Sequence, residues 1–78
     1  MKNKILAALK NAKCVSVHRG TVSGYYTQTK EIEGGFRILI ADESYSIEAF
    51  FNDIEKMEES DEKGIVLKIT DEHFIRIQ

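Results

Sequence analysis

Hydrophobic residues recur at helical spacing in two stretches of the chain. The first stretch runs from about Lys2 to Ala12, and its apolar stripe consists of Ile5, Ala8, Leu9 and Ala12. The second runs from Ser46 to Glu62, and its apolar stripe consists of Ile47, Phe50, Phe51, Ile54 and Met57. Both patterns predict amphipathic helices. Ser46 is a suitable N-cap for the second helix, because its hydroxyl can accept a hydrogen bond from a free backbone N–H group.

Alternating apolar and polar residues predict five β-strands outside these helices. The predicted strands are Cys14 to Arg19, Tyr25 to Ile32, Phe36 to Ala41, Ile65 to Thr70 and His73 to Gln78. In the second strand, the polar residues Gln28 and Lys30 fall on the same face as Ile32. Because a central strand would bury these polar side chains, we expect this strand at the edge of the sheet.

The loops between neighbouring strands set which residues lie opposite each other. A three-residue loop at 33–35 would place Ile32 opposite Phe36, and an odd-length loop at 70–72 would bring the apolar faces of the last two strands together. The element order α-β-β-β-α-β-β predicts an α+β two-layer sandwich, an antiparallel sheet of about five strands with two helices on one face. The other face, at solvent or at an interface, would carry Ser16, His18, Arg37, Lys68 and Arg76.

Length and composition predict one small cytoplasmic domain. The 78 residues form one predicted domain, 1–78, of modest stability, because a chain of this size buries a limited share of its surface. Cys14 is the single cysteine, so an internal disulfide is excluded and a reducing compartment is expected. The apolar run near the N-terminus is too short for a signal peptide or a membrane span, so we expect no membrane association.

Charge is distributed unevenly along the chain, although the net charge is only −2. Residues 1–30 contain six Lys and Arg residues and no acid, whereas residues 42–62 contain nine acids and one lysine. Acids in the last turn of a helix interact unfavourably with its dipole, so local helix stability does not explain the acids at the end of the predicted second helix. Such asymmetry concerns surfaces and partners more than it concerns the fold.

The acidic segment supports the leading functional hypothesis. A row of carboxylates on an exposed helix would present a phosphate-like surface to a basic groove on a partner protein. The residues expected to bind the partner are Glu48, Asp53, Glu55, Glu58, Glu59, Asp61 and Glu62. The alternative is that these acids only keep a small protein soluble.

In its size, its lack of disulfides, its mixed layout and its acidic half, the chain resembles the small phage-encoded inhibitors called anti-CRISPR proteins. This resemblance covers the general plan of the chain and no shared motif. It implies a non-enzymatic inhibitor that occupies the nucleic-acid-binding site of a partner such as a CRISPR nuclease, and it implies no cofactor.

The basic first half supports an alternative, a small nucleic-acid-binding domain. Aromatic side chains beside cations can stack single-stranded bases and neutralise phosphates. The residues for this function would be Arg19, Tyr25, Tyr26, Lys30 and Arg37. The layout of the first five elements resembles the double-stranded-RNA-binding domain, but the predicted second helix is acidic where that family presents lysines.

Catalysis and metal binding find little support in the sequence. Cys14 and His18 are too far apart on a strand for a thiolate–imidazole contact, and His18 with His73 lacks a third metal ligand. We therefore expect no catalytic residues, no metal and no enzyme activity. A homo-oligomer, in which the basic half of one copy meets the acidic half of another, is a further possibility.

Overall fold

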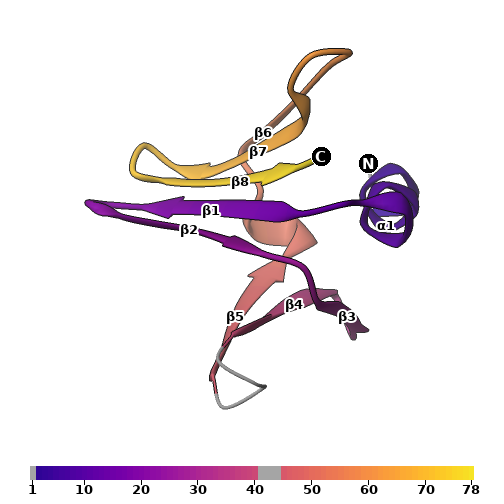
Figure 1. Cartoon of the computed structure of the whole chain (residues 1–78), viewed down its shortest axis with the longest axis horizontal. Helices are drawn as coiled ribbons and strands as arrows, with labels where there is room; N and C mark the ends of the chain where they lie inside the picture. The colour runs from indigo at the N-terminus through magenta and orange to yellow at the C-terminus, as the bar shows by residue number, and fades with distance from the viewer. Residues whose placement is uncertain (1, 41–44) are drawn as a thin grey trace.

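The computed structural model describes residues 2–40 and 45–78, and within these ranges the protein is mostly β-structure (Figure 1). Its elements are α1 (Lys2–Asn11), β1 (Val15–Arg19), β2 (Val22–Tyr26), β3 (Thr29–Ile32), β4 (Gly35–Ile40), β5 (Tyr45–Phe50), the 3-10 helix η1 (Phe51–Asp53), β6 (Lys56–Ser60), β7 (Gly64–Thr70) and β8 (His73–Ile77). The strands form two antiparallel sheets, a five-stranded one in the order β2-β1-β8-β7-β6 and a three-stranded one in the order β3-β4-β5.

The predicted fold class is therefore wrong. Two helices on a single sheet were expected, whereas the described residues contain one α-helix and eight strands in two sheets. The two sheets and α1 share one hydrophobic core, which consists of Ile5, Val15, Val17, Phe36, Ile38, Ala49, Phe51, Ile54, Ile65, Leu67, Ile75 and Ile77. The second sheet thus takes the place that the second helix was expected to fill.

The first predicted helix is confirmed as α1 (Lys2–Asn11). Ile5 is fully buried in the core, and Ala8, Leu9 and Ala12 pack partly buried against it, so the predicted stripe is the packed face. Lys10 lies in the last turn, where a cation is favourable for the helix dipole. Figure 1 shows α1 at one side of the strands, close to the C-terminal end of the chain.

The predicted helix from Ser46 to Glu62 is wrong. This segment forms β5, then one turn of 3-10 helix, then β6. Ile47 and Ala49 of β5 point inward, opposite Ile38 and Phe36 of β4. Pairing of β5 with β4 and of β6 with β7 satisfies backbone groups of the segment, and Ala49, Phe51 and Ile54 are buried although Phe50 is exposed. Tertiary pairing thus overrides the helical pattern.

The predicted strand from Tyr25 to Ile32 is divided between the two sheets. β2 ends at Tyr26 at the edge of the five-stranded sheet, and β3 begins at Thr29 at the edge of the three-stranded sheet. The expected edge position is therefore confirmed for both halves. The chain changes sheet at Thr27 and Gln28, which belong to neither strand.

The β3–β4 hairpin differs from the predicted three-residue loop. Its loop has two residues, Glu33 and Gly34, so Ile32 pairs with Gly35 and not with Phe36. Gly34 adopts a positive φ of 77°, and Gly35 lies so close to the main chain of Ala49 that a Cβ atom would collide with it. The sequence pattern did not include this close approach. The expected last residue of this strand, Ala41, and the start of the loop after it lie outside the described residues.

In the last hairpin, β7 and β8 bring the expected apolar faces together, but the loop between them differs from the predicted one. Ile65 lies opposite Ile77 and Leu67 opposite Ile75, as the apolar pattern predicts. The turn itself has two residues, and an irregularity between Lys68 and Thr70 supplies the extra residue that the pattern requires. The predicted three-residue loop is therefore wrong, whereas the predicted matching of faces is confirmed.

Candidate functional site

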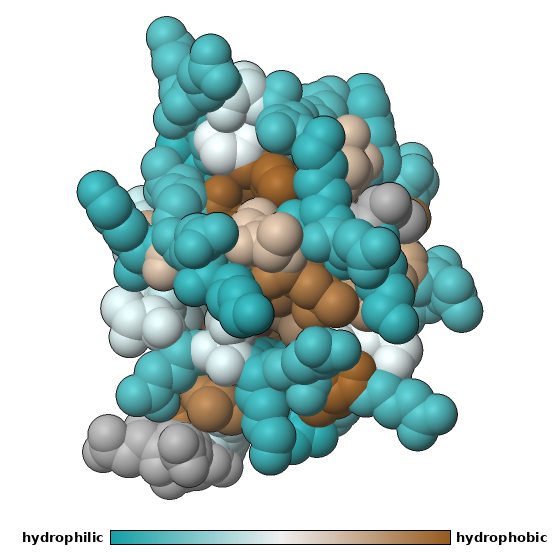
Figure 2. All heavy atoms as spheres, turned by 90° about the vertical axis from the view of Figure 1, so that its right-hand side faces the viewer, coloured by the Kyte–Doolittle hydropathy of each residue, from teal (hydrophilic) through white to brown (hydrophobic). Residues whose placement is uncertain are grey.

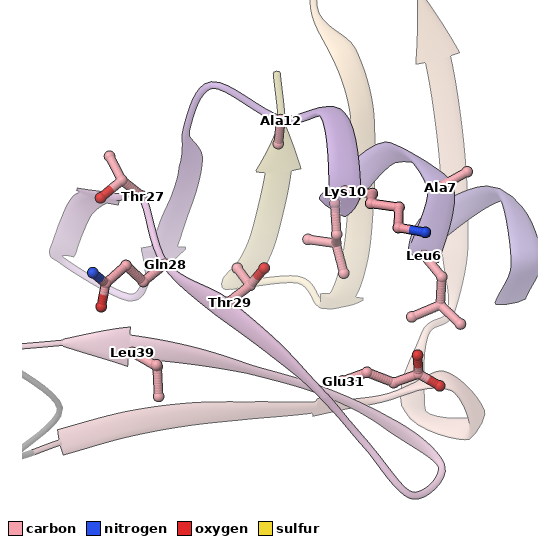
Figure 3. Close-up of a pocket in the computed structure, with 10 residues that line it drawn as sticks. Leu6, Ala7, Lys10, Ala12, Thr27, Gln28, Thr29, Glu31 and Leu39 are labelled. Carbon is pink, nitrogen blue, oxygen red and sulfur yellow. The ribbon is translucent and has the colours of Figure 1, made fainter.

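A groove of about 780 Å³ lies between α1 and β3 (Figure 3). One wall comes from α1, and the other comes from β3, its preceding residues and β4. The lining residues are Leu6, Ala7, Leu9, Lys10, Ala12, Thr27, Gln28, Thr29, Glu31 and Leu39. This volume falls in the range of about 300–1,000 Å³ that is usual for ligand sites. Figure 2, which faces the side of the molecule that carries α1, shows apolar surface between polar side chains.

The two walls present different chemistry to the groove. Leu6 points from α1 toward β3, and Glu31 points from β3 back toward the helix (Figure 3). Leu6, Leu9 and Ala12 are half-buried, so they offer an apolar surface that is only partly covered. Lys10 and Glu31 are exposed and make no ion pair within residues 2–40 and 45–78. The groove thus has a largely apolar wall on α1 and a largely polar wall at Thr27, Gln28 and Thr29, with one charge on each wall.

β3 also leaves part of its backbone unpaired along this groove. The N–H of Leu39 donates to the carbonyl of Gln28 at 2.9 Å, which makes these two residues a hydrogen-bonded pair. Antiparallel strands alternate hydrogen-bonded and non-hydrogen-bonded pairs, so Thr29 and Glu31 direct their N–H and C=O groups away from β4. Because β3 is the edge of its sheet, no strand pairs with these groups in the described part of the chain.

The carboxylates predicted to bind a partner do not share one flank. They are distributed over β5 (Glu48), η1 (Asp53), the following connection (Glu55), β6 (Glu58 and Glu59) and the β6–β7 turn (Asp61 and Glu62). Glu58 and Glu59 are successive residues of a strand and therefore point to opposite faces of the sheet. The row of carboxylates expected on a helix is consequently absent from the described residues.

Several of these carboxylates are also paired with cations. Glu59 contacts Lys4 of α1 at 2.6 Å, and Glu48 contacts Arg37 at 3.4 Å. Glu58 contacts Lys56 at 2.8 Å, and the hydrogen bond that Lys56 donates lowers the pKa of the Glu58 carboxyl.

Glu55 belongs to a second charged group, around Lys68. The Lys68 ammonium lies 3.0 Å from Asp71 and 3.4 Å from Glu55. The hydrogen bonds that Lys68 donates to Asp71 and to Glu55 raise its pKa. Pairing of this kind leaves less net charge for a partner than the sequence suggests.

The residues of the nucleic-acid alternative are separated as well. Tyr25 is 78% exposed, whereas its neighbour Tyr26 points to the other face and packs against the core. Lys30 and Arg37 lie opposite each other on the three-stranded sheet, and Arg19 is at the far end of β1. The two tyrosines therefore do not form a joint stacking surface.

The outer face of the five-stranded sheet carries most of the residues predicted for it. Ser16, His18, Lys68 and Arg76 alternate with buried residues along β1, β7 and β8, as expected. Arg37, the fifth predicted residue, belongs instead to the other sheet.

Cys14, His18 and His73 do not converge. Cys14 lies before β1, where its sulfhydryl is 3.9 Å from the side-chain oxygen of Gln78. His18 lies opposite Phe74, and His73 lies opposite Arg19, so the two histidines occupy opposite faces of the sheet. Within the described residues, no group of three or more His, Cys, Asp or Glu side chains could hold a metal ion.

The groove was not identified from the sequence, although two signals pointed toward it. Leu6 is an apolar helix residue that lies outside the predicted stripe, and the predicted edge position of 25–32 implied free backbone groups. Their proximity depends on how α1 packs, which no pattern along the chain specifies.

Comparison of the chain with protein-family models, with curated proteins and with solved structures finds no match. Among the described helices, none has the length and apolar character that crossing a membrane requires.

Proposed function

We propose that this protein is a non-enzymatic module that binds another protein through the groove between α1 and β3. The observation that carries the proposal is the combination of a half-buried apolar wall on α1 with an unpaired strand edge on β3. Exposed apolar surface beside unsatisfied backbone groups is typical of a recognition site. The cytoplasm, where a single free cysteine stays reduced, is the compartment we propose.

The groove proposal is tested by placing a bulky side chain at the border of the groove on the helix side. Ala7 is exposed and lines the groove, so Ala7→Trp should obstruct access to the groove without disturbing the core. Asn3→Trp is the matched control, because Asn3 is an exposed residue of the same helix that does not line the groove. Circular dichroism should show that both variants keep the wild-type fold.

The assay is quantitative affinity capture from extract of the producing cells, followed by titration of any purified partner. The expected result is a partner that the wild type and Asn3→Trp bind equally and that Ala7→Trp binds at least about tenfold more weakly, a difference of about 1.4 kcal/mol. If Ala7→Trp binds every partner as tightly as the wild type, the groove is not the binding site.

The β6–β7 hairpin favours a second candidate, the inhibitor function. Glu58, Glu59, Asp61 and Glu62 lie within this one hairpin, which projects from the rest of the molecule (Figure 1). We propose it as the surface that would meet a basic site on a nucleic-acid-processing enzyme, because opposite charges steer association. In its narrower form, this proposal names a CRISPR nuclease as the partner, as for the anti-CRISPR inhibitors.

Charge reversal in the turn tests the inhibitor function. The double variant Asp61→Lys/Glu62→Lys changes two exposed turn residues, and Glu33→Lys/Glu72→Lys makes the same charge change in two other turns. The measurement is DNA cleavage by purified CRISPR nucleases with each variant added. We expect the wild type and the Glu33/Glu72 variant to inhibit cleavage and the Asp61/Glu62 variant to lose this inhibition. If both variants inhibit equally, the hairpin is not the surface that contacts the nuclease.

A further inference from the structure

The free edge of β3 has the direction and position needed to accept another strand. The N–H and C=O groups of Thr29 and Glu31 face away from β4, and the side chains of the same two residues line the groove. Main-chain pairing at such an edge gives affinity, whereas the wall beside it selects side chains. The helical wall opposite this edge is formed by Leu6, Leu9 and Ala12.

We propose that the partner presents an extended segment, which adds to β3 as a fourth strand of the three-stranded sheet. This inference rests on the proposed function and names the form of the bound partner. Alternate residues of the segment would point toward α1, since side chains alternate along a strand. Four residues span about 13 Å of strand, which matches the length of β3.

Charge on the groove walls defines the segment further. α1 has no acidic residue, and its Lys10 lines the groove with no ion-pair partner in the described part of the chain. Glu31 disfavours an acidic side chain directly opposite it, because like charges opposite each other are destabilising. The segment is therefore apolar toward the leucines of α1, with an acidic side chain that meets Lys10.

The β6 edge of the five-stranded sheet is less suitable. Three of the five residues of β6 are charged (Lys56, Glu58 and Glu59), against two of the four in β3, and charged edge strands resist pairing with other chains. Glu59 is also held by Lys4 of α1. β3 differs in lining a groove whose other wall is the apolar side of α1.

The probe is a phage-displayed library of linear random dodecapeptides, selected against the wild-type protein. Selected peptides are then synthesised with a fluorescent label and titrated by anisotropy. We expect sequences with apolar residues at every second position and an acidic residue among them. N-methylation should weaken binding by about tenfold or more at alternate residues only, because only every second N–H would pair with β3.

Substitutions in the protein separate the groove from the surrounding surface. Lys10→Glu should weaken the selected peptides by about tenfold, whereas Lys30→Glu, on the other face of β3, should leave their affinity unchanged. In ¹⁵N spectra, peptide addition should slow hydrogen exchange at the amides of Thr29 and Glu31.

Three outcomes would overturn the inference: no enriched peptide, helical spacing in the enriched peptides, or equal sensitivity to N-methylation at every residue. These outcomes leave the proposed function intact if Ala7→Trp still loses a protein partner. Conversely, peptides that bind Ala7→Trp as tightly as the wild type would contradict both the groove and the strand addition.

Discussion

Replacing Ile5 with alanine tests whether α1 is packed as described, because Ile5 is the residue of this helix that is fully buried. The change removes three methyl or methylene groups, each worth about 0.8 kcal/mol when buried, which gives roughly 2.4 kcal/mol. The cavity left in the core brings the expected loss of unfolding free energy to about 2–5 kcal/mol. A chain of 78 residues has a total stability of roughly 4–12 kcal/mol, so this loss is a large share.

Urea denaturation followed by circular dichroism measures this loss. Leu6→Ala serves as the control, because Leu6 is only half-buried on the groove wall and should cost less than half as much as the Ile5 change. A loss below about 1 kcal/mol for Ile5→Ala would show that α1 is not anchored in the core. The groove would then have no fixed wall, and the proposed site would fail with it.

Three further predictions concern other parts of the molecule. Burial and the charge of Arg19 lower the pKa of His73 below its ordinary value of 6.5, so the unfolded chain binds this proton at higher pH than the folded protein. Stability should therefore decrease as the pH falls from about 6.5 through the folded-state pKa, and urea titrations at several pH values should show less of this decrease in His73→Gln. In the same assay, Gly64→Ala should lower the free energy of unfolding by more than about 1 kcal/mol, because Gly64 has a φ of 73° and a Cβ atom there would collide with the carbonyl of Ile77. Gly20→Ala should lower it less, because the space around Gly20 is open. Single-stranded DNA and RNA oligonucleotides at low salt should bind no tighter than about 0.1 mM by anisotropy, and micromolar binding would instead favour the nucleic-acid alternative.

Local patterns predicted those elements whose burial depends on one clear periodicity. The stripe of α1 identified Ile5 as buried, and the alternation of Val15 and Val17 identified β1 and its inward face. The edge position of the segment 25–32 was also predicted, but for a different reason, because Gln28 lies between the strands and Lys30 faces outward opposite Arg37. For α1 and β1 the residues that define the pattern also make the packing contacts, so sequence and structure agree.

Hairpin register was harder to predict, because it depends on close approaches between backbones. At Gly35 the chain passes against the main chain of Ala49, a contact between residues of different strands that no local pattern contains. In the last hairpin, the pairing of Leu67 with Ile75 was predictable from hydrophobicity, whereas the irregularity near Ile69 that permits it was not.

In the acidic segment, the helical pattern was wrong, and the hypothesis of an acidic partner-binding surface depended on it. Its acids required an explanation because they would oppose the dipole at the end of a helix, but a strand and a turn have only small net dipoles. Pairing with β4 places the small Ala49 opposite the fully buried Phe36, and a helix would have left that edge of β4 without a partner strand. Once the segment is a strand, the positions of Glu58 and Glu59 cost little, so opposition to a helix dipole no longer argues for a partner. The stronger argument for binding then lies at Thr29 and Glu31, which line the groove across from α1 and whose outward backbone groups have no strand beside them in the described part of the chain.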